Sequence, residues 1–198
     1  MSETKETKTL VIDTSIARAA GKDKTGTDKI DPSTVCSRQL LEVILNNAYK
    51  IAVSKELKEE WKSWYGYYSS YASKWYAEIV KRDRLTIVGN VENDQLRSAI
   101  LETTKQPSIK EAMKKDFFLL EMALATDQIV LSRDKKIRKY FKHAAVLIDE
   151  IKKILWANPD LSEEEVILWI KKGAPFEKKR QLGSHDKKII VTINRIVH

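Results

Sequence analysis

Residues 9–15 read Thr9-Leu10-Val11-Ile12-Asp13-Thr14-Ser15, and this stretch decides the fold that the sequence predicts. A run of apolar and β-branched residues that ends at an acid is typical of a strand buried on both faces. Such strands belong to parallel sheets whose two faces are covered by helices. The stretch therefore predicts an α/β protein whose first strand ends at Asp13.

The rest of the chain repeats this pattern of short apolar runs separated by helical stretches. We expect four more strands, at residues 51–53, 85–88, 129–131 and 144–148. Apolar residues at three- and four-residue spacing indicate helices over residues 33–45, 57–79, 108–124 and 135–142. Strands that alternate with helices predict a three-layer α/β/α fold with a central parallel sheet.

The pattern changes after Asp149, where regular alternation of strands and helices stops. We therefore expect one domain over residues 1–150 and a C-terminal extension over residues 151–198. The extension holds a further helix around residues 162–170. After a basic loop, the apolar run at residues 189–193 predicts an extra strand.

The amino-acid composition limits which classes of protein and of binding partner are compatible with the sequence. The 198 residues include 36 Lys and Arg against 28 Asp and Glu, a net charge of +8 that favours polyanionic partners. A single cysteine, Cys36, excludes a disulfide within the chain and a multi-cysteine zinc cluster. No stretch approaches the roughly 18 apolar residues of a membrane helix, and the first apolar run is too short for a signal peptide. We expect a cytoplasmic protein with no membrane partner.

Two acids follow predicted strands at comparable places. Asp13 follows the first strand directly, and Asp134 follows residues 129–131 by way of Ser132 and Arg133. In open α/β sheets, ligands bind outside the carboxyl ends of the strands, where both acids would stand. An isolated acid at such a place is more often the cap of the next helix, so either acid alone decides little.

A third acid, Asp116, lies within the apolar stripe of the helix predicted over residues 108–124. Burying an acid is costly unless it forms an ion pair or binds a cation. A salt bridge to arginine or lysine explains Asp116 alone equally well. Three acids that converge at one sheet edge favour a site for Mg²⁺ or Mn²⁺, which prefer carboxylate oxygens.

These residues together resemble a known family. Residues 11–15 are similar to the opening of a PIN domain, the metal-dependent nuclease fold of toxin ribonucleases that is related to flap endonucleases. Asp116, followed by the run Ile-Val-Leu-Ser-Arg-Asp at residues 129–134, resembles the second half of that family. There, an aspartate on a helix precedes a strand that ends in Ser/Thr-x-Asp. Residues 53–60 resemble the glutamate-bearing helix, and the resemblance covers residues 9–150 in order.

The resemblance implies a set of catalytic acids that also bind the metal, together with supporting hydroxyls. The acids are Asp13, Glu60, Asp116 and Asp134, and the hydroxyls are those of Thr14, Ser15 and Ser132. We choose Glu60 because it lies one helical turn from both Leu57 and Trp64, although Glu56 and Glu59 remain alternatives. The chain departs from the family pattern at Lys135 and Lys136, where many members carry another acid.

The activity that the resemblance implies is hydrolysis of phosphodiester bonds in single-stranded RNA by a Mg²⁺- or Mn²⁺-dependent endoribonuclease. Basic residues around Asp134 would contact phosphates without reading sequence. They are Arg133, Lys135, Lys136, Arg138 and Lys139. Because many relatives are toxins, an antitoxin or another protein partner is expected beside RNA, and a homodimer is also compatible with the sequence.

Residues next to Asp13 exclude two other enzyme classes. A phosphatase of the haloacid-dehalogenase type needs a second acid at the position of Ser15. A receiver-like phosphoacceptor needs paired acids where Asp13 is followed by Thr14, and an aspartate where the third strand ends at Gly89. The remaining alternative is a catalytically inactive PIN-like scaffold that binds RNA or protein, with its acids in salt bridges to Arg133 or to lysines.

Overall fold

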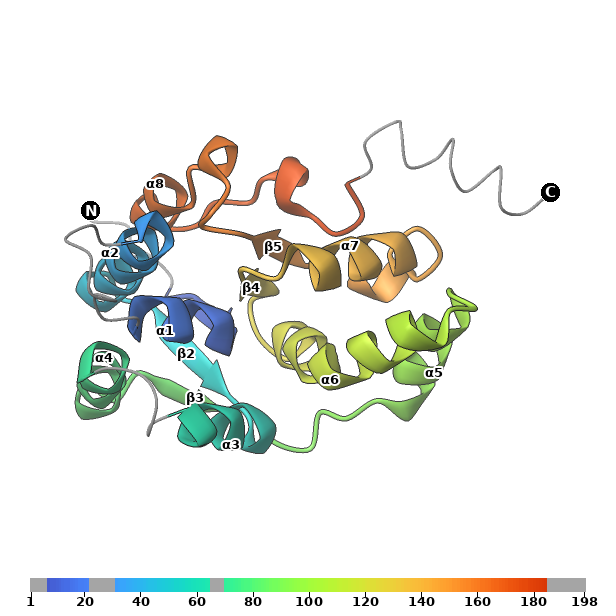
Figure 1. Cartoon of the computed structure of the whole chain (residues 1–198), viewed down its shortest axis with the longest axis horizontal. Helices are drawn as coiled ribbons and strands as arrows, with labels where there is room; N and C mark the ends of the chain where they lie inside the picture. Colours follow the sequence, from blue (N-terminus) through green and yellow to red (C-terminus); the bar gives the residue numbers. More distant parts are fainter. Residues whose placement is uncertain (1–6, 22–30, 65–69, 185–198) are drawn as a thin grey trace, which may run out of the picture.

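A five-stranded, all-parallel sheet forms the centre of the protein in a computed structural model that describes residues 7–21, 31–64 and 70–184 (Figure 1). The strands are β1 (Thr9–Ile12), β2 (Lys50–Val53), β3 (Leu85–Ile87), β4 (Ile129–Leu131) and β5 (Leu155–Ala157). Their order is β3-β2-β1-β4-β5, so the chain moves outward from β1 to β3 and then returns to the other side of β1. The carboxyl ends of β1 and β4 therefore form the switch point at which ligands bind in such sheets.

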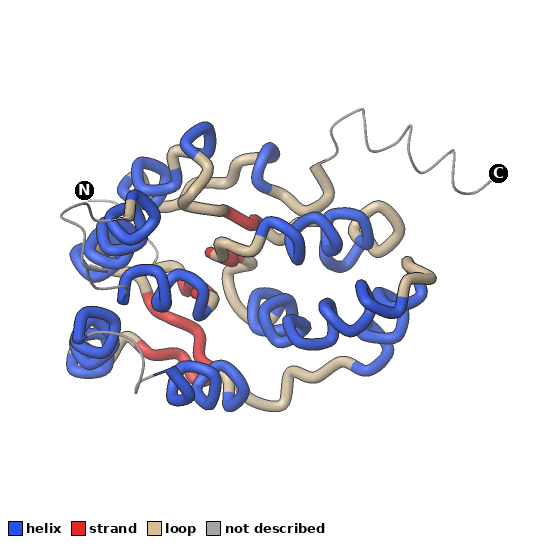
Figure 2. Tube along the Cα trace, in the orientation of Figure 1, coloured by secondary structure: helices blue, strands red, loops and turns tan. Residues whose placement is uncertain are grey.

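Helices cover both faces of the sheet, as the tube in Figure 2 shows. One layer contains α1 (Thr14–Gly21), α2 (Pro32–Asn46), α4 (Ser70–Lys81) and α8 (Val166–Lys171). The other contains α3 (Lys55–Trp64), α5 (Asp94–Glu102), α6 (Pro107–Leu124) and α7 (Lys135–Ala144). Three short 3-10 helices follow α7 in the chain: η1 (Asp149–Ile151), η2 (Ser162–Glu164) and η3 (Lys178–Arg180). The predicted three-layer α/β/α fold is confirmed.

Successive residues of β1, β2, β4 and β5 belong to different cores. In β1, Leu10 and Ile12 pack with residues of α1, α2, α4 and α8, whereas Val11 packs with residues of α5, α6 and α7. All three side chains are fully buried. Burial on both faces explains why the strand is a continuous apolar run rather than an alternating one.

The prediction of the fifth strand is wrong. Residues 144–148 end α7 and form a turn in which the N–H groups of Leu147 and Ile148 donate to the carbonyl of Ala144. Leu147 is 65% exposed, whereas a strand inside this sheet would bury both faces. The fifth strand is β5, which pairs with β4. The sheet thus extends past residue 150, and residues 189–193 lie outside the described part of the chain.

The helix predicted over residues 57–79 corresponds to two described helices, α3 and α4. The ring of Trp61 lies with its centroid 6.0 Å from that of Trp75 and 5.2 Å from that of Tyr76. These aromatic rings therefore pack between the two helices. None of the described helices combines the length and apolar composition needed to cross a bilayer.

Candidate active site

Asp13 stands at the carboxyl end of β1, and hydroxyl groups hold its carboxylate in place. The hydroxyls of Ser15 and Ser132 each donate a 2.5 Å hydrogen bond to Oδ2 of Asp13. The hydroxyl of Thr14 donates to Oδ1 at 3.3 Å. Because Ser132 follows β4, its hydrogen bond links the ends of two neighbouring strands. Asp13 is only 7% exposed and is fixed at the switch point of the sheet.

Asp134 directly precedes α7 and is the N-cap of that helix. Its Oδ1 accepts hydrogen bonds from the backbone N–H of Lys136 (2.8 Å) and of Ile137 (2.9 Å). The backbone N–H of Asp134 itself donates to Oγ of Ser132 at 3.1 Å. These bonds fix the carboxyl group beside the end of β4. The helix cap occupies Oδ1, so Oδ2 is the oxygen left for another ligand.

Asp116 lies on α6, half-buried, and its carboxyl group makes no hydrogen bond or salt bridge with the described residues. Burial, followed by the charges of Asp13, Asp134 and Glu60, raises the pKa of Asp116 to about 7. Like charges act in this way only over short distances. Acids from four separate elements therefore face the same region.

Glu60 of α3 is the glutamate that the fold brings to this region. Its side chain is half-buried, and burial together with the charge of Asp13 raises its pKa, while a hydrogen bond with Thr14 opposes the rise. Glu56 and Glu59 are exposed. Hydrogen bonds with its own backbone and with Ser54 lower the pKa of Glu56. The charge of Asp13 contributes to the raised pKa of Glu60, whereas it is not among the causes that shift the pKa of Glu56.

The donor chemistry of the four acids fits a hard divalent cation, because all of their ligating atoms are carboxylate oxygens. A half-buried Asp116 without an ion pair in the described chain also fits, since a cation would offset the repulsion among the acids. Among residues 7–21, 31–64 and 70–184, however, no three ligating side chains are gathered closely enough to hold one ion. Asp13, Glu60, Asp116 and Asp134 are the residues that would hold it.

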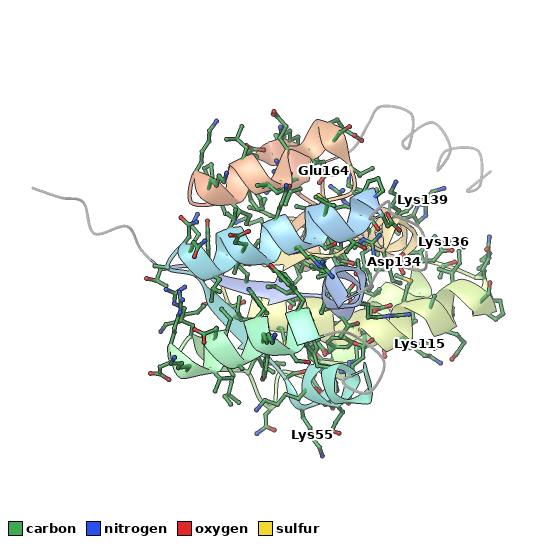
Figure 3. All side chains as sticks on the ribbon, turned by 60° about the vertical axis from the view of Figure 1, so that its left-hand side comes forward. Lys55, Lys115, Asp134, Lys136, Lys139 and Glu164 are labelled. Atoms are coloured by element: carbon green, nitrogen blue, oxygen red, sulfur yellow. The ribbon has the colours of Figure 1, made fainter. Side chains whose placement is uncertain are left out.

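The predicted phosphate contacts divide into two groups. Lys135, Lys136 and Lys139 are exposed, and Figure 3 shows Lys136 and Lys139 near Asp134. Arg138 is instead only 9% exposed and pairs with Glu164.

Arg133, also predicted to contact phosphate, binds within the protein. Its Nε lies 2.8 Å from Oδ2 of Asp160, and its backbone N–H donates to Oγ of Ser15 at 3.1 Å. The scaffold alternative expected Arg133 to pair with the candidate acids. The acid that pairs with its guanidinium is Asp160, which follows β5.

Sequence reasoning missed two groups of residues around the acids. Asn158 follows β5 and is fully buried; its side-chain amide donates to the carbonyl of Arg133 at 3.1 Å. It was missed because the fifth strand was predicted too early in the chain. A surface pocket of about 340 Å³ also adjoins Glu60, and its lining includes Lys114, Lys115 and Phe118. The two lysines next to Asp116 were the available signal.

Comparison of the chain with protein-family models, with curated proteins and with solved structures finds no match. The function has to be argued from the site itself.

Proposed function

We propose that the chain is a PIN-like endoribonuclease that uses Mg²⁺ or Mn²⁺ to hydrolyse phosphodiester bonds in single-stranded RNA. The observation that carries the proposal is Asp116, which is half-buried among three other acids and has its pKa raised to about 7. A bound divalent ion would lower the pKa of a water molecule and neutralise charge on the attacked phosphate. The choice of RNA over DNA rests on the family resemblance.

The residues around the acids have roles that suit this activity. The hydroxyls of Ser15 and Ser132 keep the Asp13 carboxylate oriented, and the cap of α7 does the same for Asp134. Such supporting hydrogen bonds fix the geometry of metal ligands. Exposed lysines next to Asp134 would attract the phosphate backbone toward a region that the acids otherwise make repellent.

A second candidate is a PIN-like scaffold that binds RNA or protein without cleaving it. It is favoured by one observation: no three ligating side chains in the described residues are gathered around one position. In a scaffold of this kind, the +8 net charge would bind RNA while the acids served only to orient the ends of β1 and β4.

A cleavage assay separates the two candidates. Wild type, Asp13→Asn and Asp116→Asn are incubated with a single-stranded RNA, or with DNA of the same length, in Mn²⁺ or in EDTA. Asp83→Asn is the matched control, because Asp83 is exposed between α4 and β3 and its positive φ of 54° is one that asparagine adopts readily.

We expect wild type and the Asp83→Asn control to cleave RNA only with Mn²⁺, and the two site variants to lose at least ~100-fold in rate. Cleavage that persists in EDTA, or that survives both site substitutions, contradicts the metal-dependent nuclease. RNA binding without any cleavage by folded wild type identifies the scaffold.

A further inference from the structure

A second, strongly basic pocket lies next to the candidate active site. It has a volume of about 490 Å³ and is lined by six basic side chains, two acidic ones and one leucine. The lining residues are Lys135, Arg138, Lys139, Lys142, Leu161, Glu163, Glu164, Lys179 and Arg180. The excess of basic over acidic groups makes this pocket suited to anions.

One wall of the pocket is a single face of α7. Lys135, Arg138, Lys139 and Lys142 are spaced by three and four residues, so they share one side of the helix. This face begins one residue after Asp134. The pocket therefore starts beside the acids, on the α7 side, whereas the pocket of Phe118 adjoins Glu60.

The opposite wall is held by Glu164, whose charge is already shared between two arginines. Arg138 pairs with Oε1 of Glu164, and Nη1 of Arg180 lies 3.5 Å from Oε2. The same Oε2 accepts a 2.9 Å hydrogen bond from the backbone N–H of Asn158. Arg180 is 1% exposed, and its guanidinium stacks 4.5 Å from the centre of the Trp169 ring. These contacts hold this wall of the pocket in place, and both carboxylate oxygens of Glu164 already have partners within the protein.

Three of the pocket lysines, Lys135, Lys139 and Lys179, keep most of their positive charge available for a ligand. Lys135 and Lys139 are exposed and form no salt bridge within the described chain. Lys179 lies 3.4 Å from Glu177, but Nε of Arg180 binds the same carboxylate oxygen at 2.8 Å. The carboxylates of Glu164 and Glu177 are already bound by arginines, and Glu163 adds only one further negative charge against six basic side chains. The pocket therefore retains a net positive charge.

We propose that this pocket binds phosphate groups of the nucleic-acid strand on one side of the cleavage position. Ammonium groups around a concave site form charge-assisted hydrogen bonds with phosphate oxygens. The inference rests on the proposed function for the identity of the strand, whereas the charge and shape of the pocket do not depend on a metal. It gives residues 161–180 a role in holding the substrate.

The test is binding of a fluorescently labelled 12-nucleotide RNA, measured by anisotropy in EDTA so that no cleavage occurs. The pocket variant is Lys139→Glu with Lys179→Glu. The control is Lys74→Glu with Lys105→Glu, which makes the same change in net charge at exposed lysines on α4 and before α6. Circular dichroism verifies that both variants are folded.

We expect the pocket variant to bind the RNA at least ~10-fold more weakly than the control. The slope of log K against log salt should fall by about 1.4, or about 0.7 for each phosphate that the two lysines no longer neutralise. RNA carrying a 5′-phosphate is compared with RNA carrying a 5′-hydroxyl. A preference for the 5′-phosphate that the pocket variant loses identifies a terminal phosphate in the pocket, and equal binding of the two RNAs identifies internal phosphates.

Equal weakening in the pocket and control variants overturns the proposal, as does wild type that binds no RNA. The outcome is separable from that of the nuclease proposal. Binding that needs Lys139 and Lys179, in a protein that never cleaves with Mn²⁺, leaves the pocket standing and removes the nuclease. Metal-dependent cleavage by a protein whose RNA binding is insensitive to these lysines supports the nuclease and overturns the proposal for the pocket.

Discussion

Replacing Asp116 by asparagine removes one negative charge from the centre of the acidic site and keeps the shape of the side chain. Burial, followed by the charges of three neighbouring acids, raises the pKa of Asp116 from 3.8 to about 7 in the folded protein. The folded state therefore holds this proton more tightly than the unfolded state does. The resulting stability is complete below about pH 4 and is lost as the pH rises through 7. Above pH 7, the ionised carboxylate destabilises the fold.

The size of the effect follows from the two pKa values. A rise from 3.8 to about 7 corresponds to roughly 4 kcal/mol at high pH. Solvent reaches part of this half-buried group and screens its charge, so we expect about 1–3 kcal/mol. In a chain of this length, that is an increase of about 3–10 °C in the Tm of Asp116→Asn over wild type at pH 8.

Thermal unfolding in EDTA between pH 4.5 and pH 8 measures this difference, with Asp83→Asn as the control. We expect Asp116→Asn to be more stable than wild type at pH 8, with most of the advantage gone at pH 4.5. Asp83→Asn should follow wild type throughout. A difference in Tm that does not change with pH, or an Asp116→Asn protein less stable at pH 8, would refute the view that burial and the neighbouring acids raise the pKa of Asp116.

Substitutions at three further positions, Ser132, Arg97 and Asp134, each remove hydrogen bonds that the structure shows. Ser132→Ala removes a 2.5 Å hydrogen bond to Asp13, and we expect a loss of roughly 10–100-fold in the initial rate of RNA cleavage with an unchanged circular dichroism spectrum. Arg97→Met leaves the 3%-exposed carboxylate of Glu121 without its two 2.7 Å bonds, so urea unfolding should show a loss of about 3–5 kcal/mol that Glu121→Gln in the same chain partly restores. Asp134→Ala removes the cap of α7 and should cost about 0.5–2 kcal/mol in addition to cleavage, whereas Asp134→Asn should keep the cap and lose only cleavage.

A specific result would contradict each of these predictions. Normal cleavage by Ser132→Ala means that the orientation of Asp13 does not limit the reaction. An unchanged free energy of unfolding in Arg97→Met means that the Glu121 carboxylate forms another interaction or becomes protonated. Normal cleavage by Asp134→Asn shows that Asp134 is only a helix cap.

β1, β2 and β4 could be predicted because burial on both faces produces apolar runs that stand out in the sequence. β3 lies at the edge of the sheet with Ile87 exposed, and the apolar run that precedes Gly89 predicted it. β5 could not be predicted in the same way. Leu155-Trp156-Ala157 is as short as other apolar segments, and its pairing with β4 is what makes it a strand. The run at 144–148 looks similar, but it follows the buried face of α7 into a turn. Pattern alone does not separate two such segments.

The positions of Asp13 and Asp134 followed from the rule for the carboxyl ends of parallel strands, because only the order of strands is needed to apply it. The same rule could not predict that Arg138 is buried and paired with Glu164. Its partner Glu164 lies 26 residues further along the chain and comes after β5. A prediction that misplaced β5 could not bring these two residues together, and it treated Arg138 only as a phosphate contact.

Direct measurement of Mn²⁺ binding tests the central claim, that the four acids form a divalent-metal site. Free Mn²⁺ is followed by electron paramagnetic resonance during titration of wild type, Asp13→Asn, Asp116→Asn and the Asp83→Asn control. We expect saturable binding of about one or two ions by wild type and the control, and loss of that binding in both site variants. Absence of saturable binding in folded wild type, or binding that Asp116→Asn leaves unchanged, would contradict the claim.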